Sequence, residues 1–239
     1  MDLRHPTYAL AALTTLLAAG CLGGADSIHL RSIVAPSPDV VDGFDAYGSG
    51  AWAEGKAYGH WALGFHGYGE VGVEEVDGDP ALRMTPRVAG SSWMTHAGLV
   101  VSLAEFEDVE VEAVTRTSRQ LREGAEPNAW EVGWLLWDYV DNDHFYYLIA
   151  KPNGWELGKR DPAYPGNQRF LATGESMTFP VGEDIHLRVR RVGPTIDVWA
   201  DDVHLVTYTD DENPYTGGAV ALYTEDADVL WDDLRVTEM

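Results

Sequence analysis

Short runs of alternating apolar and polar residues fill the chain from about residue 42 to its end. They are rich in Val, Ile, Tyr, Trp and Thr, and Gly, Asp, Asn and Pro separate them, which is the pattern of strands joined by turns. We expect strands at residues 58–65, 69–76, 80–85, 96–103, 107–117, 130–139, 143–151, 154–160, 168–172, 184–192, 195–200, 203–209, 217–224 and 228–236. Residues 118–129 are expected to form a loop or a short helical turn. Strands at this spacing, without a long 3.6-residue periodicity, predict one all-β domain, a sandwich or a barrel.

Two tight turns predict how neighbouring strands pair. Asn153-Gly154 suits a two-residue type I′ turn, which would place Lys151 opposite Glu156. Alternation would then direct Leu148, Ala150 and Leu157 toward the core. The opposite face would mix charged, aromatic and small residues, namely Tyr147, Ile149, Lys151, Glu156, Gly158 and Arg160. A second tight turn is expected at Asp201-Asp202.

The N-terminal residues have the character of an export signal. Residues 1–20 contain a short basic start and then an apolar stretch of about 12 residues, which is too short to span a bilayer as a helix. The stretch ends in Leu17-Ala18-Ala19-Gly20-Cys21, which resembles the lipobox of bacterial and archaeal lipoproteins. That resemblance implies a signal peptide at 1–20, a lipidated Cys21 followed by a flexible tether to residue 41, and a folded domain at 42–239. The protein would then sit on the extracellular face of the cell membrane, held there only by its lipid.

The charge balance excludes two classes of partner. The chain of 239 residues carries 39 acidic and 16 basic residues, a net charge of −23. Such a surface does not neutralise phosphates, so we expect no nucleic-acid partner. Electrostatic attachment to an anionic bilayer is disfavoured for the same reason. The abundance of carboxylates over lysines resembles proteins of salt-loving microbes, in which high ionic strength screens the repulsion; an ordinary acidic secreted protein is the alternative.

Aromatic and polar residues are concentrated between residues 127 and 173. Aromatic rings cover the apolar face of a sugar, and neighbouring polar groups bind its hydroxyls. The segment therefore predicts a surface for a polysaccharide or oligosaccharide, with a set of candidate ligand-binding residues: Trp137, Tyr147, Lys151, Trp155, Arg160, Gln168 and Arg169. The alternative is a Trp-rich core in which Lys151 and Glu156 form a cross-strand ion pair.

Two carboxyl groups in this region are candidates for catalysis. Glycoside hydrolysis generally uses a pair of carboxyl groups on either side of the scissile bond. Glu131 and Glu156 are the best such pair, because both lie on predicted strands among the aromatic residues. A lyase would instead need a cation to neutralise a uronate, and Lys151 with Arg169 could supply it. The sequence leaves binding and cleavage open.

The metal that the sequence allows is calcium. The histidines lack any zinc-ligand spacing, whereas clustered carboxylates suit a hard cation. Candidate ligands for a structural calcium are Asp42, Asp45, Asp77, Asp79, Asp232 and Asp233. Asp-Gly pairs are also ordinary turn formers. The chain has no P-loop and no G-x-G-x-x-G between a strand and a helix, so we expect no nucleotide, and we expect no haem.

Several motifs carry a resemblance to a known superfamily. They are Phe145-Tyr146-Tyr147, the segment Pro152 to Lys159, His186 to Val189, Ile196 to Asp201, Gly217 to Tyr223, and Trp231 to Val236. Together they resemble successive strands of the concanavalin A-like lectin/glucanase superfamily, nearest to the 3-keto-disaccharide hydrolase domain family. The resemblance implies a two-sheet antiparallel jelly-roll sandwich. It implies no single chemistry, because relatives include enzymes, lectins and binding modules.

Three functions therefore remain open at this point. The first is an exported, lipid-anchored carbohydrate-binding domain without catalysis. The second is a glycan-cleaving enzyme, a hydrolase or a lyase, on the same fold. The third is a structural or adhesive surface domain whose aromatic residues are all core; full burial of Trp130, Trp137 and Trp155 would favour it.

Overall fold

The computed structural model describes residues 39–91 and 93–239. The expected signal peptide, Cys21 and nearly all of the tether lie outside these residues. Seventeen strands and one 3-10 helix make up the described part. Their bounds are β1 Val40–Asp42, β2 Gly50–Ala51, β3 Ala57–Tyr58, β4 Trp61–Phe65, β5 Glu70–Val76, β6 Asp79–Thr85, β7 Ala97–Phe106, β8 Val109–Gln120, β9 Gly133–Asp141, β10 His144–Lys151, β11 Gly154–Arg160, η1 Pro165–Asn167, β12 Gln168–Gly174, β13 Asp184–Val192, β14 Thr195–Ala200, β15 Val203–Thr209, β16 Gly218–Glu225 and β17 Ala227–Glu238.

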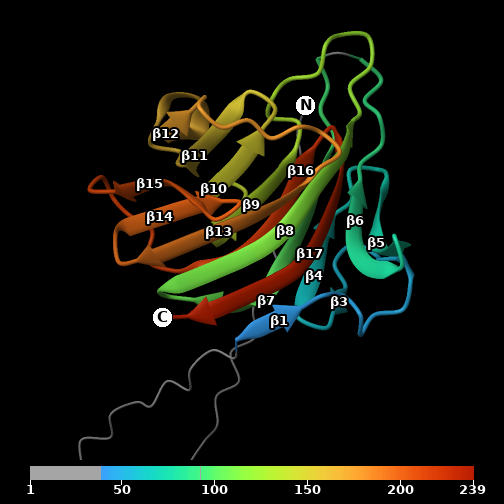
Figure 1. Ribbon diagram of the computed structural model, residues 1–239, viewed down its shortest axis with the longest axis horizontal. Coiled ribbons are helices and arrows are strands. Elements are labelled where there is room, and N and C mark those ends of the chain that lie inside the picture. The colour runs from blue at the N-terminus through green and yellow to red at the C-terminus, as the bar shows by residue number, and fades with distance from the viewer. Residues whose placement is uncertain (1–38, 92) are drawn as a thin grey trace, which may run out of the picture. The chain divides into compact units, whose positions relative to one another are not determined.

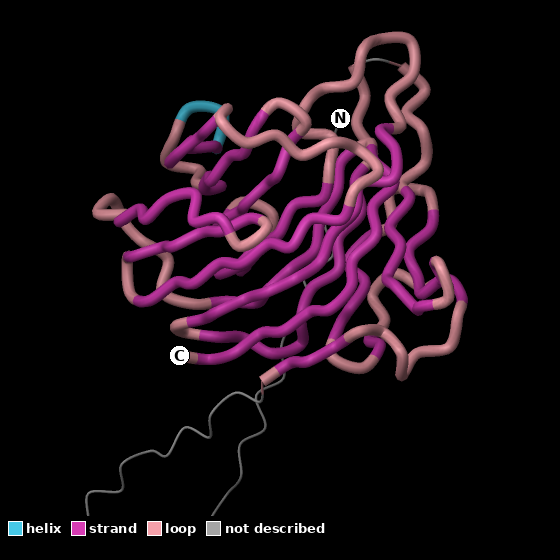
Figure 2. The backbone as a smooth tube through the Cα atoms, viewed as in Figure 1, coloured by secondary structure: helices cyan, strands magenta, loops and turns pink. Residues whose placement is uncertain are grey.

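The strands form two antiparallel sheets that pack face to face (Figures 1 and 2). The nine-stranded sheet has the order β15-β14-β13-β8-β17-β6-β5-β2, with β1 paired to β17. The eight-stranded sheet has the order β12-β11-β10-β9-β16-β7-β4-β3. The predicted all-β fold, a two-sheet antiparallel jelly-roll sandwich, is confirmed. Pairing of β1 with β17 brings the first and last strands together, and β1 begins just before residue 42, where the domain was expected to start.

Most predicted strands are found at the predicted positions, and the exceptions are local. The run expected at 58–65 divides into β3 and β4, because Gly59 and His60 form the turn between them. Residues 118–129 form no helix; β8 continues to Gln120 and a loop follows. Among the described residues no helix is long and apolar enough to cross a membrane.

The hydrophobic core lies between the sheets and follows the alternation of side chains along each strand. On β9 and β10 the inward positions are Leu135, Trp137, Tyr146 and Leu148, all of which belong to the main core cluster. The residues between them point the other way. They form a second apolar cluster on the far side of the eight-stranded sheet, made of Leu99, Val132, Trp134, Leu136, Tyr147, Ile149 and Ala221. We call this second side the outer face.

The register of the β10–β11 hairpin differs from the predicted one. Lys151 lies opposite Gly154 and Ile149 lies opposite Glu156, so Pro152 and Asn153 form the turn. Gly154 is not a turn residue; it is the point at which β11 approaches β12, because a Cβ there would overlap the carbonyl O of Gly174. The observed register is shifted by two residues from the predicted one. Because side chains alternate with a period of two, every side chain stays on its predicted face. The tight turn at Asp201-Asp202 is confirmed, with both residues at positive φ between the paired Ala200 and Val203.

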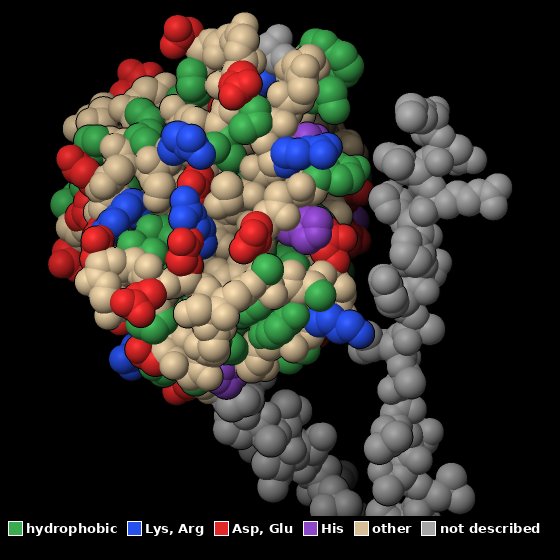
Figure 3. Space-filling view, turned by 90° about the vertical axis from the view of Figure 1, so that its right-hand side faces the viewer, with side chains coloured by type: hydrophobic (Ala, Val, Ile, Leu, Met, Phe, Trp, Pro, Cys, Tyr) green, Lys and Arg blue, Asp and Glu red, His purple; other side chains and the backbone are tan. Residues whose placement is uncertain are grey.

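The charged side chains at the surface are more often acidic than basic. On the face shown in Figure 3, acidic side chains are scattered over the surface, with several Lys and Arg side chains among them. This distribution agrees with the excess of 39 acidic over 16 basic residues. Ions at moderate salt screen such exposed charges from one another.

Candidate functional site

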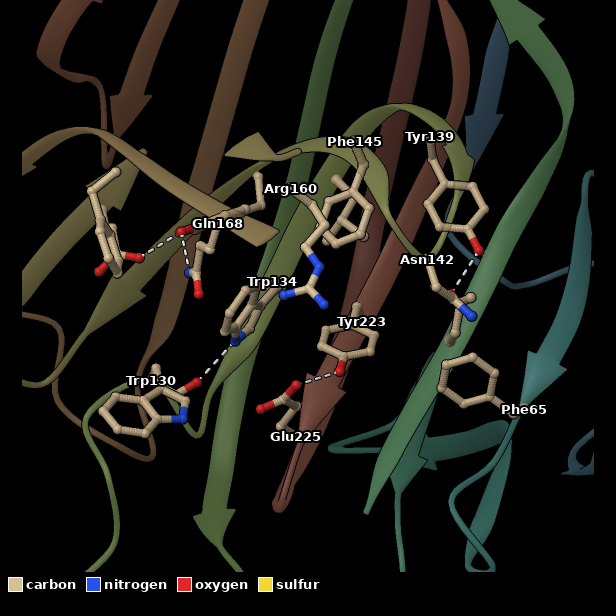
Figure 4. Close-up of a pocket in the computed structure, with 15 residues that line it drawn as sticks. Phe65, Trp130, Trp134, Tyr139, Asn142, Phe145, Arg160, Gln168, Tyr223 and Glu225 are labelled. Carbon is tan, nitrogen blue, oxygen red and sulfur yellow. Dashed lines mark hydrogen bonds between the residues drawn. The ribbon is translucent and has the colours of Figure 1, made fainter. Parts of the chain in front are cut away.

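The outer face of the eight-stranded sheet carries a cavity of about 570 Å³. This volume lies within the range of small-molecule sites in proteins. Eight of the fifteen lining residues are aromatic: Phe65, Trp130, Trp134, Tyr139, Phe145, Tyr147, Phe170 and Tyr223. Figure 4 labels six of these rings, those of Phe65, Trp130, Trp134, Tyr139, Phe145 and Tyr223, around an open space, with Arg160 and Glu225 pointing into it.

Packing of rings from three neighbouring strands builds the floor of the cavity. Trp134 on β9 lies between Tyr147 on β10 and Tyr223 on β16, with ring centroids 4.8 Å and 5.6 Å apart. The indole N–H of Trp134 donates to the carbonyl O of Trp130 at 2.8 Å, which joins the floor to the loop before β9. Trp130 and Phe170 stand at the edge of the cavity and stay 46% and 62% exposed, so both rings remain available to a ligand.

A hydrogen-bonded network holds the polar side of the cavity. Tyr147 donates its hydroxyl to Glu156 Oε1 at 2.8 Å and accepts from Gln168 Nε2 at 2.6 Å. Lys151 Nζ lies 2.8 Å from the other oxygen, Glu156 Oε2. Burial raises the pKa of Tyr147 far above its usual range, so its hydroxyl stays protonated and keeps donating. Gly158, opposite Tyr147 in the register, is required here because a Cβ would overlap the tyrosine ring.

Glu225 is the second carboxyl group of the cavity. Tyr223 donates its hydroxyl to Glu225 Oε1 at 2.5 Å. Burial raises the pKa of Glu225, while Arg160 opposes that rise. Asp226 follows directly at positive φ, and its carboxylate binds the guanidinium of Arg122 at 3.0 Å. The turn at Asp226 therefore fixes where Glu225 enters the cavity.

Four of the nine predicted catalytic and ligand-binding residues line the cavity. Tyr147, Glu156, Arg160 and Gln168 do so, each from a strand position that alternation directs outward. Lys151 stands behind them and contacts Glu156. Asn142, Trp134, Tyr223 and Glu225 also line it and were not predicted. Along β16, alternation directs Tyr223 and Glu225 to the same face. Both residues could have been predicted if the pairing of β16 with β9 had been known.

Two predicted ligand-binding tryptophans are corrected by the structure. Trp137 is fully buried, and Trp155 is 6% exposed; both belong to the core between the sheets. Their positions have inward parity, Trp137 beside Leu135 and Trp155 opposite Ala150. A ligand cannot reach either ring without separating the sheets.

Arg169, a predicted ligand-binding residue, and Glu131, a predicted catalytic residue, do not line the cavity. Arg169 pairs with Asp210 at 3.1 Å and with Glu212 at 2.9 Å, away from the cavity lining. The Glu131 carboxylate is fully buried and accepts from Arg122 at 2.5 Å and Asn128 at 2.6 Å. Only Glu156 of the predicted catalytic pair lines the cavity, so the structure does not bring the two carboxyl groups together there. Glu131 instead acts with Arg122 and Asp226 in holding the loop that leads to Trp130.

The six predicted calcium ligands lie in different surroundings. Asp42 is buried, and its carboxylate accepts from Phe44 N, Tyr47 Oη and Trp61 Nε1 at 2.5–2.9 Å, so it ties the chain start to the core. Asp77 forms an ion pair with Arg116 at 3.4 Å. Within the described ranges, no group of three or more His, Cys, Asp or Glu residues has the arrangement of a metal site. Calcium therefore stays a prediction.

Asp232 is the predicted calcium ligand whose pKa is changed by its surroundings. Burial raises the pKa of Asp232 to about 6, and the charges of Asp233, Asp79 and Asp45 add to the rise. A folded-state pKa above the unfolded value means that the stability contributed by protonated Asp232 is present below about pH 4 and is lost as the pH rises through about 6.

We therefore expect the Asp232→Asn variant to gain stability relative to the wild-type domain as the pH rises from 4 to 7. The free energy of urea-induced unfolding at several pH values measures this difference. Asp211→Asn, at an exposed aspartate outside the cluster, is the control. A difference between Asp232→Asn and wild type that does not change with pH would contradict the prediction. If the cluster binds calcium, added Ca²⁺ should raise the melting temperature of wild type more than that of Asp232→Asn.

Comparisons with known proteins find structures with a similar fold but no protein of similar sequence. No protein-family model matches the chain, and no curated protein matches it either. The structure is similar to carbohydrate-binding module CBM66 from Bacillus subtilis, with a TM-score of 0.54 and 13% identity over 75% of this chain and 96% of that one. It is also similar to the β-glucanase of Bacillus licheniformis, with a TM-score of 0.56 and 8% identity over 84% and 98% of the two chains.

A third similar structure comes from a study of endo-acting O-glycanases that initiate mucin breakdown in the human gut microbiota. The TM-score is 0.55 and the identity 16%, over 84% of this chain and 98% of that one. At such identities these likenesses show the fold alone, and it is the fold expected of the concanavalin A-like superfamily. The finer resemblance to the 3-keto-disaccharide hydrolase domain family is not confirmed.

Proposed function

We propose that this protein binds a saccharide in the cavity on the outer face of its eight-stranded sheet. The observation that carries the proposal is the lining itself, in which eight aromatic side chains surround a few polar groups. Rings of this kind cover the C–H faces of a sugar, and the polar groups between them orient its hydroxyls. The similarity to CBM66 and to the β-glucanase supports the proposal only through the shared fold.

The polar atoms left free by the internal network suit hydroxyl recognition. Gln168 donates to Tyr147 through Nε2, which leaves its carbonyl oxygen as an acceptor. Asn142 accepts from Tyr139 through Oδ1 at 2.9 Å, which leaves its NH₂ group as a donor. One acceptor and one donor on opposite sides of an aromatic floor can fix the orientation of a bound sugar ring.

The arrangement favours binding over cleavage. Both oxygens of Glu156 already bind partners inside the protein, Tyr147 and Lys151. Glu225 is then the remaining carboxyl group in the cavity, whereas most glycoside hydrolases need two. A purely structural role is not favoured either, because Trp130 is 46% exposed although Trp137 and Trp155 are buried.

Replacement of Trp130 by alanine should weaken saccharide binding about tenfold or more. The exposed ring would lose its stacking contact, and a loss of about 1.4 kcal/mol corresponds to a factor of ten. Titration calorimetry with the polysaccharide that wild type selects from a panel measures the change. Trp93→Ala is the matched control, since Trp93 is 83% exposed and does not line the cavity. Equal losses in both variants, or none in Trp130→Ala, would place the binding site elsewhere.

Cleavage by a single carboxyl acid is the second candidate function, and one observation favours it. A partly buried glutamic acid whose pKa is raised by burial, and which accepts a hydrogen bond from a tyrosine, has the properties of a general acid. We expect Glu225→Gln to keep saccharide affinity within a few-fold. If wild type releases oligosaccharides that mass spectrometry detects, the same variant should release none. Absence of products from wild type on every bound polysaccharide, at low and high salt, would exclude this candidate.

We further propose that the domain is exported and held at the outer face of the membrane by a lipid on Cys21. The motif ending at Cys21 supports this, and a single lipid tether leaves the domain free in the aqueous phase. In the producing cell, Cys21→Ser should move the protein from the membrane fraction to the soluble fraction. Mass spectrometry of the wild-type N-terminus should find an acyl or prenyl adduct on the cysteine. An unmodified cysteine in the wild-type protein would contradict the proposal.

A further inference from the structure

The cavity contains one basic residue in a chain that has few of them. Arg160 is the only Lys, Arg or His among the fifteen lining residues. It extends from the end of β11, and Figure 4 shows its guanidinium directed into the space beside Trp134, Phe145 and Tyr223. Most of the surrounding lining is apolar, so a charge placed there interacts more strongly than it would in open water.

The protein leaves most of this guanidinium without a partner. Within the described part of the chain, the polar contacts of the Arg160 guanidinium are with the carbonyl O of Gly166 at 3.4 Å and the carboxylate of Asp143 at 3.6 Å. Both distances are long for a hydrogen bond to a charged group, and the Asp143 side chain is 55% exposed. A guanidinium has five N–H donors, so several of them remain available on the cavity side.

Two buried arginines of the domain differ from Arg160 in this respect. Arg122 is bound to Glu131 and Asp226, and Arg191 is bound to Asp138 and Asp108, all at 2.5–3.1 Å. With 39 acidic residues in the chain, close carboxylate partners are abundant. The guanidinium of Arg160, whose side chain is 32% exposed, is paired more weakly than those of Arg122 and Arg191.

Neither acidic residue that lines the cavity forms a close ion pair with Arg160. Glu156 is paired with Lys151 at 2.8 Å. Among the described residues Glu225 forms no ion pair with Arg160; the charge of Arg160 acts on Glu225 only as a small opposition to the rise in pKa that burial causes. An oxyanion on a ligand would meet an arginine whose planar fork matches carboxylate and sulfate groups.

We infer that the saccharide bound in this cavity is acidic, and that Arg160 binds its carboxylate or sulfate group. This inference rests on the proposed saccharide-binding function and names the class of sugar that the site selects. The aromatic floor would hold the ring of the acidic unit, and Gln168 and Asn142 would contact hydroxyls. Arg160 would then determine specificity, and the aromatic rings would supply most of the contact area.

Pairs of saccharides that differ only in charge test the inference. Oligogalacturonate and its methyl ester test a carboxylate, and a sulfated galactan oligosaccharide with its desulfated form tests a sulfate ester. Titration calorimetry at constant salt should show at least tenfold tighter binding to the charged member of one pair, and this identifies the group. Arg160→Gln should remove that preference while changing the affinity for the neutral member less than threefold. Arg160→Lys, which keeps the charge and loses the fork, should retain part of the preference.

Arg188→Gln is the matched control, because Arg188 lies over Trp199 on the other sheet at 3.9 Å and is remote from the lining. Thermal unfolding confirms that each variant is folded. Equal binding of both members of each pair, or an equal loss for both in Arg160→Gln, would overturn the inference and leave saccharide binding intact. Failure of every charged and neutral saccharide to bind would overturn both.

Discussion

The structure depends on one constraint, which is that the eight-stranded sheet has large apolar side chains on both of its faces. On β9 and β10 the inward residues fill the core, while Trp134, Leu136, Tyr147 and Ile149 point away from the other sheet. Apolar area exposed to water is unfavourable at about 25 cal/mol per Å². The outer face lessens this cost by packing its rings against one another, and a contiguous apolar surface that remains after such packing commonly marks a binding site.

Buried ionic groups lie on both sides of the eight-stranded sheet. Arg122 joins Glu131 and Asp226 near the loop that leads to Trp130 and near Glu225. On the inward side, Lys159 is fully buried and contacts Asp210 at 2.9 Å, and Asp210 also accepts from Tyr146 at 2.6 Å. Removing one partner from such a pair leaves an uncompensated buried charge, which is strongly destabilising. The Arg122 network therefore sets the positions of Trp130 and Glu225 at the cavity.

The sequence predicted the fold class, most strands and the two faces of the β10–β11 hairpin, because these follow from the period of two that every strand imposes. It placed Tyr147, Glu156 and Arg160 on one face for the same reason, and Gln168 was a candidate only through the composition of its segment. It failed at Trp137 and Trp155, since tryptophans occur at both parities in this segment and composition does not tell which face is inward. It also missed Tyr223 and Glu225, because pairing of β16 with β9 joins residues about 90 positions apart and no local pattern reports it. Glu131 was misassigned because the strand pattern does not show that its carboxylate is fully buried and bound to Arg122 and Asn128.

The central claim is that the aromatic cavity on the outer face binds a saccharide, and the indole N–H signals of the tryptophans test it most directly. A ¹⁵N-labelled domain can be titrated with acidic and neutral oligosaccharides while its nine indole signals are followed by NMR. The account predicts that the signals of Trp130 and Trp134 shift in a saturable way, and that those of Trp93, Trp137 and Trp231 do not. Saturable shifts confined to Trp93 or to the tryptophans of the nine-stranded sheet, or no shift with any saccharide, would contradict it.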